Sequence, residues 1–124
     1  MSRAVMILDD DDDLRETLAE MFQLMCGVET LLAPDVEGMV AIGNEVLRSA
    51  IAFIDVNLGP GQPSGLDAYH WLVEHEYHGR VVFLTGHARL QTQVEQAVIE
   101  GIAEVVQKPA NAKVLCELVE KTAE

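Results

Sequence analysis

The sequence AVMILDDDDD, residues 4–13, decides the fold, because five apolar residues lead directly into five aspartates. An unbroken apolar run of this length is typical of a strand that is buried on both faces of a parallel sheet. The end of that strand should therefore lie at the carboxyl edge of the sheet. Two carboxylates there, roughly 5 Å apart at an effective dielectric of about 20, repel each other by about 3 kcal/mol. We expect a cation, a cationic side chain or solvent to offset this repulsion.

Three later apolar runs also lead into residues that bind metals or phosphoryl groups. They cover residues 50–54, 81–84 and 105–106, and the polar residues that follow them are Asp55, Thr85 and Lys108 in turn. Strand ends that carry aspartates, an aspartate, a threonine and a lysine in this order predict a magnesium-assisted phosphoryl-acceptor site.

Segments with the period of an amphipathic helix separate the apolar runs. Apolar stripes fall within residues 14–25, 66–73, 90–98 and 114–119, a less periodic helix is expected over 36–47, and a weak strand over 28–32. Asp12 or Asp13 is the expected N-cap of the first helix, and Gly27 its terminator. Strands that alternate with helices predict one parallel sheet with right-handed crossovers and helices on both faces. Ligands of such open sheets bind beyond the carboxyl ends of the strands.

The composition fits a single domain that comprises residues 1–124, because 49% of the residues are hydrophobic. Eight Lys and Arg against 21 Asp and Glu give a net charge of −13, which disfavours direct binding to nucleic acid or to an anionic membrane. The apolar runs are too short for a membrane span or a signal-peptide core, so we expect a cytoplasmic location. Cys26 and Cys116 lack metal-binding spacing and are expected to be free thiols near the core.

The residues at the strand ends predict a specific division of roles. Mg²⁺ prefers oxygen ligands and keeps several waters, so Asp10 and Asp55 are the expected direct ligands and Asp9 holds a coordinated water. Asp55 is also the expected nucleophile, which forms an aspartyl phosphate. The ammonium group of Lys108 and the hydroxyl group of Thr85 would contact the phosphoryl oxygens.

Four short motifs follow one another in an order that is found in a known family: MILDD (6–10), FIDVNL (53–58), VFLTG (82–86) and QKP (107–109). On these motifs the chain resembles the response-regulator receiver domains of two-component signal transduction along essentially its whole length. The resemblance implies a doubly wound, flavodoxin-like α/β fold. This fold has a five-stranded parallel sheet in the order 2-1-3-4-5 and five helices.

The resemblance also implies how the site works. Asp55 would accept a phosphoryl group from a histidine kinase or a histidine phosphotransfer protein. Asp9 and Asp10 would bind Mg²⁺, with a third protein ligand in the backbone carbonyl of Asn57.

Signalling would then pass through the switch hydroxyl of Thr85 and the phosphoryl-binding Lys108. The resemblance implies that an effector binds one face of the domain. This face is formed by the fourth expected helix (90–98), the fifth strand (105–106) and the fifth expected helix (114–119). The resemblance leaves homodimerisation open. It implies a switch that catalyses its own phosphorylation and dephosphorylation, and not an enzyme that acts on a metabolite.

The chain departs from the family pattern in three places, one of which is the segment from Thr85 to Gly101, one residue longer than usual. The loop at 59–64 is longer than usual, and Val105 stands three residues before the lysine, where the family often has an aromatic residue. Because Val105 replaces the aromatic residue, a degenerate receiver that acts only as a docking module is an alternative interpretation. A haloacid-dehalogenase-type phosphatase also uses a strand-end aspartate, but Asn57 occupies the place of its second acid and cannot transfer a proton. A flavin-binding module would need to bind phosphate where this chain carries five anions.

Overall fold

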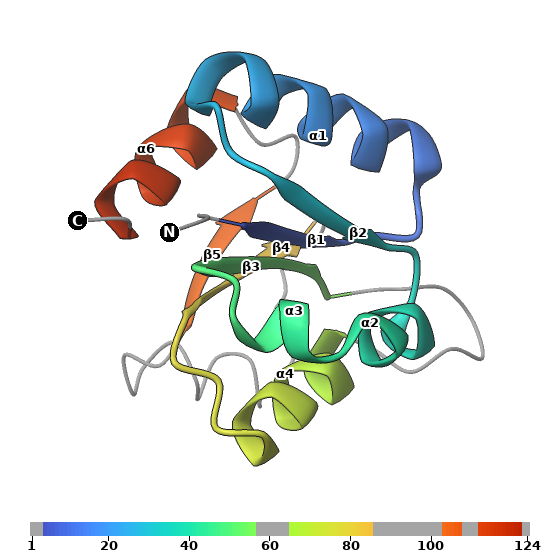
Figure 1. Ribbon diagram of the computed structural model, residues 1–124. Coiled ribbons are helices and arrows are strands. Elements are labelled where there is room, and N and C mark those ends of the chain that lie inside the picture. Colours follow the sequence, from blue (N-terminus) through green and yellow to red (C-terminus); the bar gives the residue numbers. More distant parts are fainter. Residues whose placement is uncertain (1–3, 57–64, 86–102, 108–111, 123–124) are drawn as a thin grey trace.

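The computed structural model describes residues 4–56, 65–85, 103–107 and 112–122. Its centre is a five-stranded parallel sheet in the order β2-β1-β3-β4-β5 (Figure 1). The strands are β1 (Val5–Leu8), β2 (Thr30–Ala33), β3 (Ile51–Asp55), β4 (Arg80–Thr85) and β5 (Ala103–Gln107). The strand order that the resemblance implies is therefore confirmed.

Helices cover both faces of the sheet, with α1 and α6 on one face and α2, α3 and α4 on the other (Figure 1). Their bounds are α1 (Asp12–Cys26), α2 (Val36–Ile42), α3 (Asn44–Leu47), α4 (Gly65–Glu74) and α6 (Ala112–Thr122). The helix expected at 90–98 and the long loop at 59–64 lie outside the described residues. In the described part of the chain, no helix is both long enough and apolar enough to cross a membrane.

Two hydrophobic cores explain why β1 is an unbroken apolar run. Met6 and Leu8 point to the core beneath α2, α3 and α4, whereas Val5 and Ile7 point to the core beneath α1 and α6. All four side chains are fully buried. Alternate residues of one strand thus bury on opposite faces, as the parallel-sheet prediction requires.

The start of α1 differs by one residue from the prediction. Asp11, and not Asp12 or Asp13, is the N-cap: its backbone is extended and its carboxylate accepts a hydrogen bond from the Leu14 N–H at 3.1 Å. Asp12 and Asp13 occupy the first turn, where the helix dipole favours negative charge. The predicted stop at Gly27 is confirmed, because Gly27 has the left-handed φ of 64° that closes the helix.

Two other elements also shift from their predicted bounds. The helix expected over 36–47 is divided at Gly43, whose φ of 67° ends α2 and precedes α3. The strand expected over 28–32 begins later, at Thr30. Its register with β1, in which Thr30 pairs with Val5, sets that start.

The expectation of free thiols is wrong, because Cys26 and Cys116 form a disulfide in the structure. It joins the last residue of α1 to the second turn of α6, with the two Cα atoms 6.2 Å apart. The two helices lie side by side on one face of the sheet (Figure 1). This arrangement brings together two cysteines that are 90 positions apart in the sequence.

Candidate functional site

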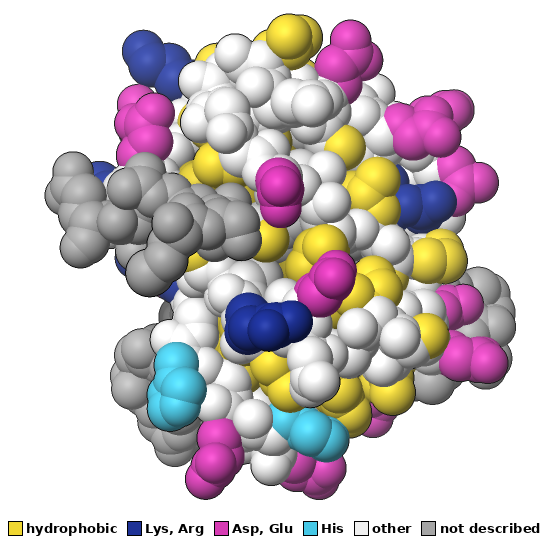
Figure 2. Space-filling view, in the orientation of Figure 1, with side chains coloured by type: hydrophobic (Ala, Val, Ile, Leu, Met, Phe, Trp, Pro, Cys, Tyr) yellow, Lys and Arg dark blue, Asp and Glu magenta, His cyan; other side chains and the backbone are white. Residues whose placement is uncertain are grey.

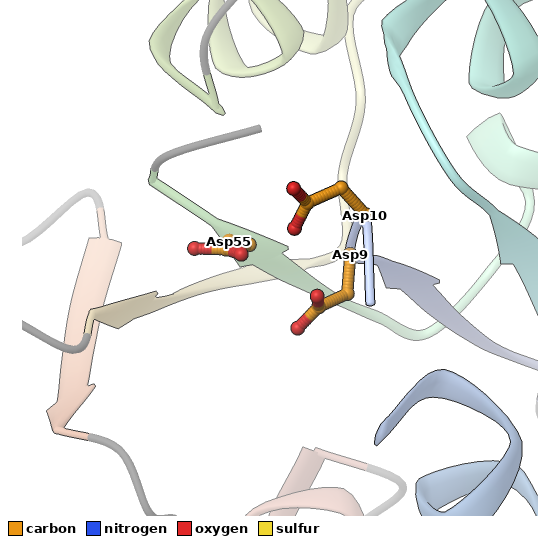
Figure 3. Close-up of side chains that lie close together, drawn as sticks. All are labelled: Asp9, Asp10 and Asp55. Carbon is orange, nitrogen blue, oxygen red and sulfur yellow. The ribbon is translucent and has the colours of Figure 1, made fainter. Parts of the chain in front are cut away.

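Three carboxylates meet at the carboxyl edge of the sheet. Asp9 and Asp10 follow β1, and Asp55 ends β3, which is the neighbour of β1 in the sheet. One carboxylate oxygen from each residue lies within 4.8 Å of the other two. Figure 3 shows the three side chains turned toward the same space beyond the strand ends.

Burial of these carboxylates lowers the stability of the folded state unless a positive charge lies nearby. Asp9 is completely buried and Asp55 is 5% exposed, whereas Asp10 is exposed. At 4.8 Å and an effective dielectric of about 20, each pair of unit charges repels by about 3 kcal/mol. On the face drawn in Figure 2, acidic side chains are scattered among few basic ones. The cluster is therefore a strong attractor of cations.

The donor set fits Mg²⁺. This ion takes oxygen ligands, needs only one or two carboxylates and keeps several of its waters. Asp9, Asp10 and Asp55 supply three such oxygens, and the exposed side chain of Asp10 leaves one flank of the cluster open to solvent. These three residues are the ones that would hold the ion.

Arg15 fixes the backbone on which Asp9 sits. Its Nη1 donates to the backbone carbonyl of Asp9 at 2.7 Å, and its Nη2 pairs with the carboxylate of Asp12. The Asp9 carboxylate in turn accepts the N–H of Asp11 at 2.9 Å. Sequence reasoning missed Arg15, although it is the one basic residue between positions 4 and 47 and lies two residues after the aspartate run.

Gly65 is a second residue that sequence reasoning missed. It is the first residue of α4, and its N–H donates to the carbonyl of Val56 at 3.0 Å. A Cβ at this position would lie 2.3 Å from the backbone oxygen of Asp55 and 2.9 Å from the Ile54 Cγ2 atom. Only glycine allows α4 to begin this close to the end of β3. The sequence signal was a glycine at the junction of a turn-rich stretch and an apolar helical stripe.

Of three further predicted site residues, the structure describes only Thr85. Thr85 ends β4, one residue beyond Leu84, which is the register partner of Asp55. Its backbone therefore lies at the same edge as the carboxylates. Lys108 directly follows the end of β5, but it lies outside the described residues, as does Asn57.

Val105 lies within β5, where it pairs with Phe83 and packs, half-buried, against the core beneath α2, α3 and α4. It is therefore a core-facing strand residue and not an exposed one.

Comparisons with known proteins show the family to which this chain is similar. A family model described as "Response regulator receiver domain" matches residues 5–120. The search of curated proteins found no match. The family match favours the receiver reading over the phosphatase and flavin-binding alternatives.

Several solved receiver domains are similar in structure. A CheY-like receiver domain protein from Methanospirillum hungatei JF-1 shares 23% identity at a TM-score of 0.82, covering 99% of this chain and 95% of that one. A BeF3-activated DrrB receiver domain shares 20% identity at a TM-score of 0.80, covering 99% and 98%. The receiver domain of NtrX from Brucella abortus shares 26% identity at a TM-score of 0.78, covering 95% and 96%.

Proposed function

This chain belongs to the response regulator receiver domain family, and we propose that it is the phosphoacceptor of a two-component phosphorelay. In this proposal Asp55 receives a phosphoryl group from a phosphohistidine of a sensor kinase or a phosphotransfer protein. The observation that carries it is the nearly buried Asp55 carboxylate, grouped within 4.8 Å of oxygens from Asp9 and Asp10. A carboxylate in this setting is held as a nucleophile beside a cation site.

The transfer is a displacement at phosphorus. A carboxylate oxygen of Asp55 forms the new O–P bond while the P–N bond to the donor imidazole breaks, and the electron pair stays on the imidazole nitrogen. Asp9, Asp10 and Asp55, with the backbone carbonyl of Asn57, are proposed to hold Mg²⁺. When bound, the ion would neutralise charge on the phosphoryl oxygens, which otherwise repel the attacking carboxylate.

Two residues from the neighbouring strands complete the proposed site. The ammonium group of Lys108, which follows β5, would pair with one phosphoryl oxygen as a point charge. The hydroxyl group of Thr85 would donate a hydrogen bond to another. The parallel register of β3, β4 and β5 supports both roles, because it brings the ends of these strands to one edge.

The proposed output is a change in partner binding. Phosphorylation would bias a two-state surface that includes β5 and α6 toward an effector. In this proposal the domain acts in the cytoplasm and modifies only itself, so it is a switch and not an enzyme with a metabolite substrate. Because Val105 cannot swing as an aromatic side chain would, the change would pass through backbone and helix movement.

Binding of Mg²⁺ and of beryllofluoride, a phosphoryl mimic, tests the proposed site by thermal unfolding. An ion that binds only the folded state stabilises it by about 1.4 kcal/mol at tenfold Kd, which raises the Tm by roughly 5 °C. Beryllofluoride should raise it further, and only when Mg²⁺ is present.

Asp10→Asn and Asp13→Asn form a matched pair for this test. Both residues are exposed and belong to the same aspartate run, but only Asp10 is in the cluster. We expect Asp10→Asn to lose the Mg²⁺ shift and Asp13→Asn to keep it. Equal shifts in both variants, or no shift in the wild type, would remove the basis for the metal site.

A further inference from the structure

The disulfide between Cys26 and Cys116 has no part in the phosphoryl chemistry, yet it connects two elements that flank the sheet. Cys26 is the last residue of α1, and Cys116 lies in the second turn of α6. The two helices share one face of the sheet (Figure 1). A covalent link at this place fixes the position of one helix relative to the other.

The position of α6 depends strongly on α1. Among the described elements, α1 is the one that α6 contacts most. Among residues 113–121 of α6, for which burial is described, the buried ones are Leu115, Cys116 and Val119, so the cysteine of the bridge is one of the anchoring residues. A helix of 11 residues is marginal on its own and owes its stability to such packing. Opening the bridge should therefore loosen α6 more than any other described element.

The two cysteine residues differ in their burial. Cys26 is half-buried at the end of α1, where the chain turns away at Gly27, whereas Cys116 is only 5% exposed within the core. Thiol–disulfide exchange requires that an external thiolate reach one sulfur. The structure therefore favours attack at Cys26, with Cys116 as the leaving thiolate.

We propose that Cys26 and Cys116 form a reversible thiol–disulfide site whose state sets how firmly α6 is held against α1. A small thiol such as glutathione opens the site, and glutathione disulfide closes it. This inference stands on the contacts of α1 and α6 and does not depend on phosphorylation of Asp55. If the proposed function also holds, the site would act on the partner-binding surface that includes α6.

The reaction balances as a two-electron exchange. A glutathione thiolate attacks the Sγ of Cys26, the S–S bond breaks, and Cys116 leaves as a thiolate that takes up a proton. A second glutathione thiolate attacks the glutathione sulfur of the mixed disulfide and releases Cys26 as a thiolate. The protein disulfide is reduced to two thiols, and two glutathione molecules are oxidised to glutathione disulfide.

The test combines thiol trapping and amide exchange on the folded wild-type chain, without denaturant. The protein is equilibrated with reduced glutathione or with glutathione disulfide, treated with N-ethylmaleimide, and its intact mass is measured. We expect two maleimide adducts after reduced glutathione and none after glutathione disulfide. Hydrogen exchange of the α6 amides should be about tenfold faster in the reduced state, while that of β1 and β3 is unchanged.

Cys26→Ser is the first control, because this half-buried position tolerates a hydroxyl group, and Cys116→Ala is the second. In both variants we expect α6 to exchange at the reduced rate under either condition. Three results would overturn the proposal: adducts that form only after denaturation, adducts under both redox conditions, or reversible adducts with equal exchange of α6. The first indicates a permanent crosslink, the second no bridge, and the third a bridge that does not hold α6.

Discussion

Single residues around the carboxylate cluster set its geometry, and Arg15 does so through the backbone. Its side chain is 13% exposed, and the guanidinium group donates to the backbone carbonyl of Asp9, a residue that is completely buried. A hydrogen bond from a charged donor contributes about 1.5–3 kcal/mol, and its loss leaves the carbonyl short of a partner. Arg15 thus links the start of α1 to the position of the first predicted metal ligand.

Replacing Arg15 with Gln should lower the free energy of unfolding by about 2 kcal/mol in urea denaturation and weaken the Mg²⁺-induced rise in Tm. Arg48→Gln is the matched control, since Arg48 is exposed and lies outside the cluster. We expect it to change stability by less than about 0.5 kcal/mol. Equal effects of the two substitutions would show that the contact between Arg15 and Asp9 contributes nothing.

Gly65→Ala should damage the site as well as the fold. The new Cβ would lie 2.3 Å from the Asp55 oxygen, so either α4 or the end of β3 must move, at a cost of about 1–3 kcal/mol. We expect lower stability and a slower rate of phosphorylation by acetyl phosphate. In the control Gly27→Ala, nothing lies within 4 Å of the new Cβ and only the left-handed φ is strained. That variant should lose stability but keep the rate, so a normal rate in Gly65→Ala would contradict the account.

Tyr77 gives the fold a dependence on alkaline pH. Burial raises the pKa of Tyr77 to about 12, although the hydrogen bond to the Ser49 hydroxyl lowers it in part. The unfolded chain ionises first, near pH 10, so the contribution of Tyr77 is complete below that pH and is lost as the pH rises toward about 12.

The wild type should therefore lose stability more steeply than Tyr77→Phe over this pH range, as measured by urea unfolding at several pH values. Parallel pH profiles for the two proteins would show that Tyr77 ionises equally in both states.

At the scale of elements, the helical spacing of apolar residues predicted α1, α4 and α6 correctly, because each of these helices carries a clear apolar stripe that packs on the sheet. The same spacing did not predict that the helix over 36–47 is divided at Gly43. One glycine lowers the stability of a helix by only about 1 kcal/mol and leaves the apolar spacing unchanged. The division of α2 from α3 depends instead on the positive φ of Gly43. The N-cap at Asp11 was likewise undetermined, because any of several consecutive aspartates satisfies the capping pattern.

The link between α1 and α6 should contribute to stability. A disulfide between cysteines that lie 90 positions apart in the sequence typically contributes about 2–4 kcal/mol. We expect Cys26→Ser to lower the unfolding free energy by this amount under oxidising conditions. Under reducing conditions the wild type and the variant should be nearly equal. A variant as stable as the oxidised wild type would show that the bridge adds nothing.

At the scale of the whole molecule, strand order joins what the sequence separates. Asp9 and Asp55 were predicted to meet because both follow apolar runs that end at one edge of a parallel sheet, and the pairing of β1 with β3 confirms this. The pairing of Cys26 with Cys116 could not be predicted in this way. Periodicity assigns each cysteine to a helix, but it does not say which two helices lie together on one face of the sheet.

The central claim, that Asp55 accepts the phosphoryl group, is tested most directly by intact-mass analysis after incubation with acetyl phosphate and Mg²⁺. The samples are the wild type, Asp55→Asn, and Asp67→Asn as a control at an exposed aspartate of α4. We predict one added phosphoryl group on the wild type and on Asp67→Asn, none on Asp55→Asn, and none on any of them when Mg²⁺ is removed. A phosphoryl group that persists on Asp55→Asn, or a wild type that takes up none, would contradict the account.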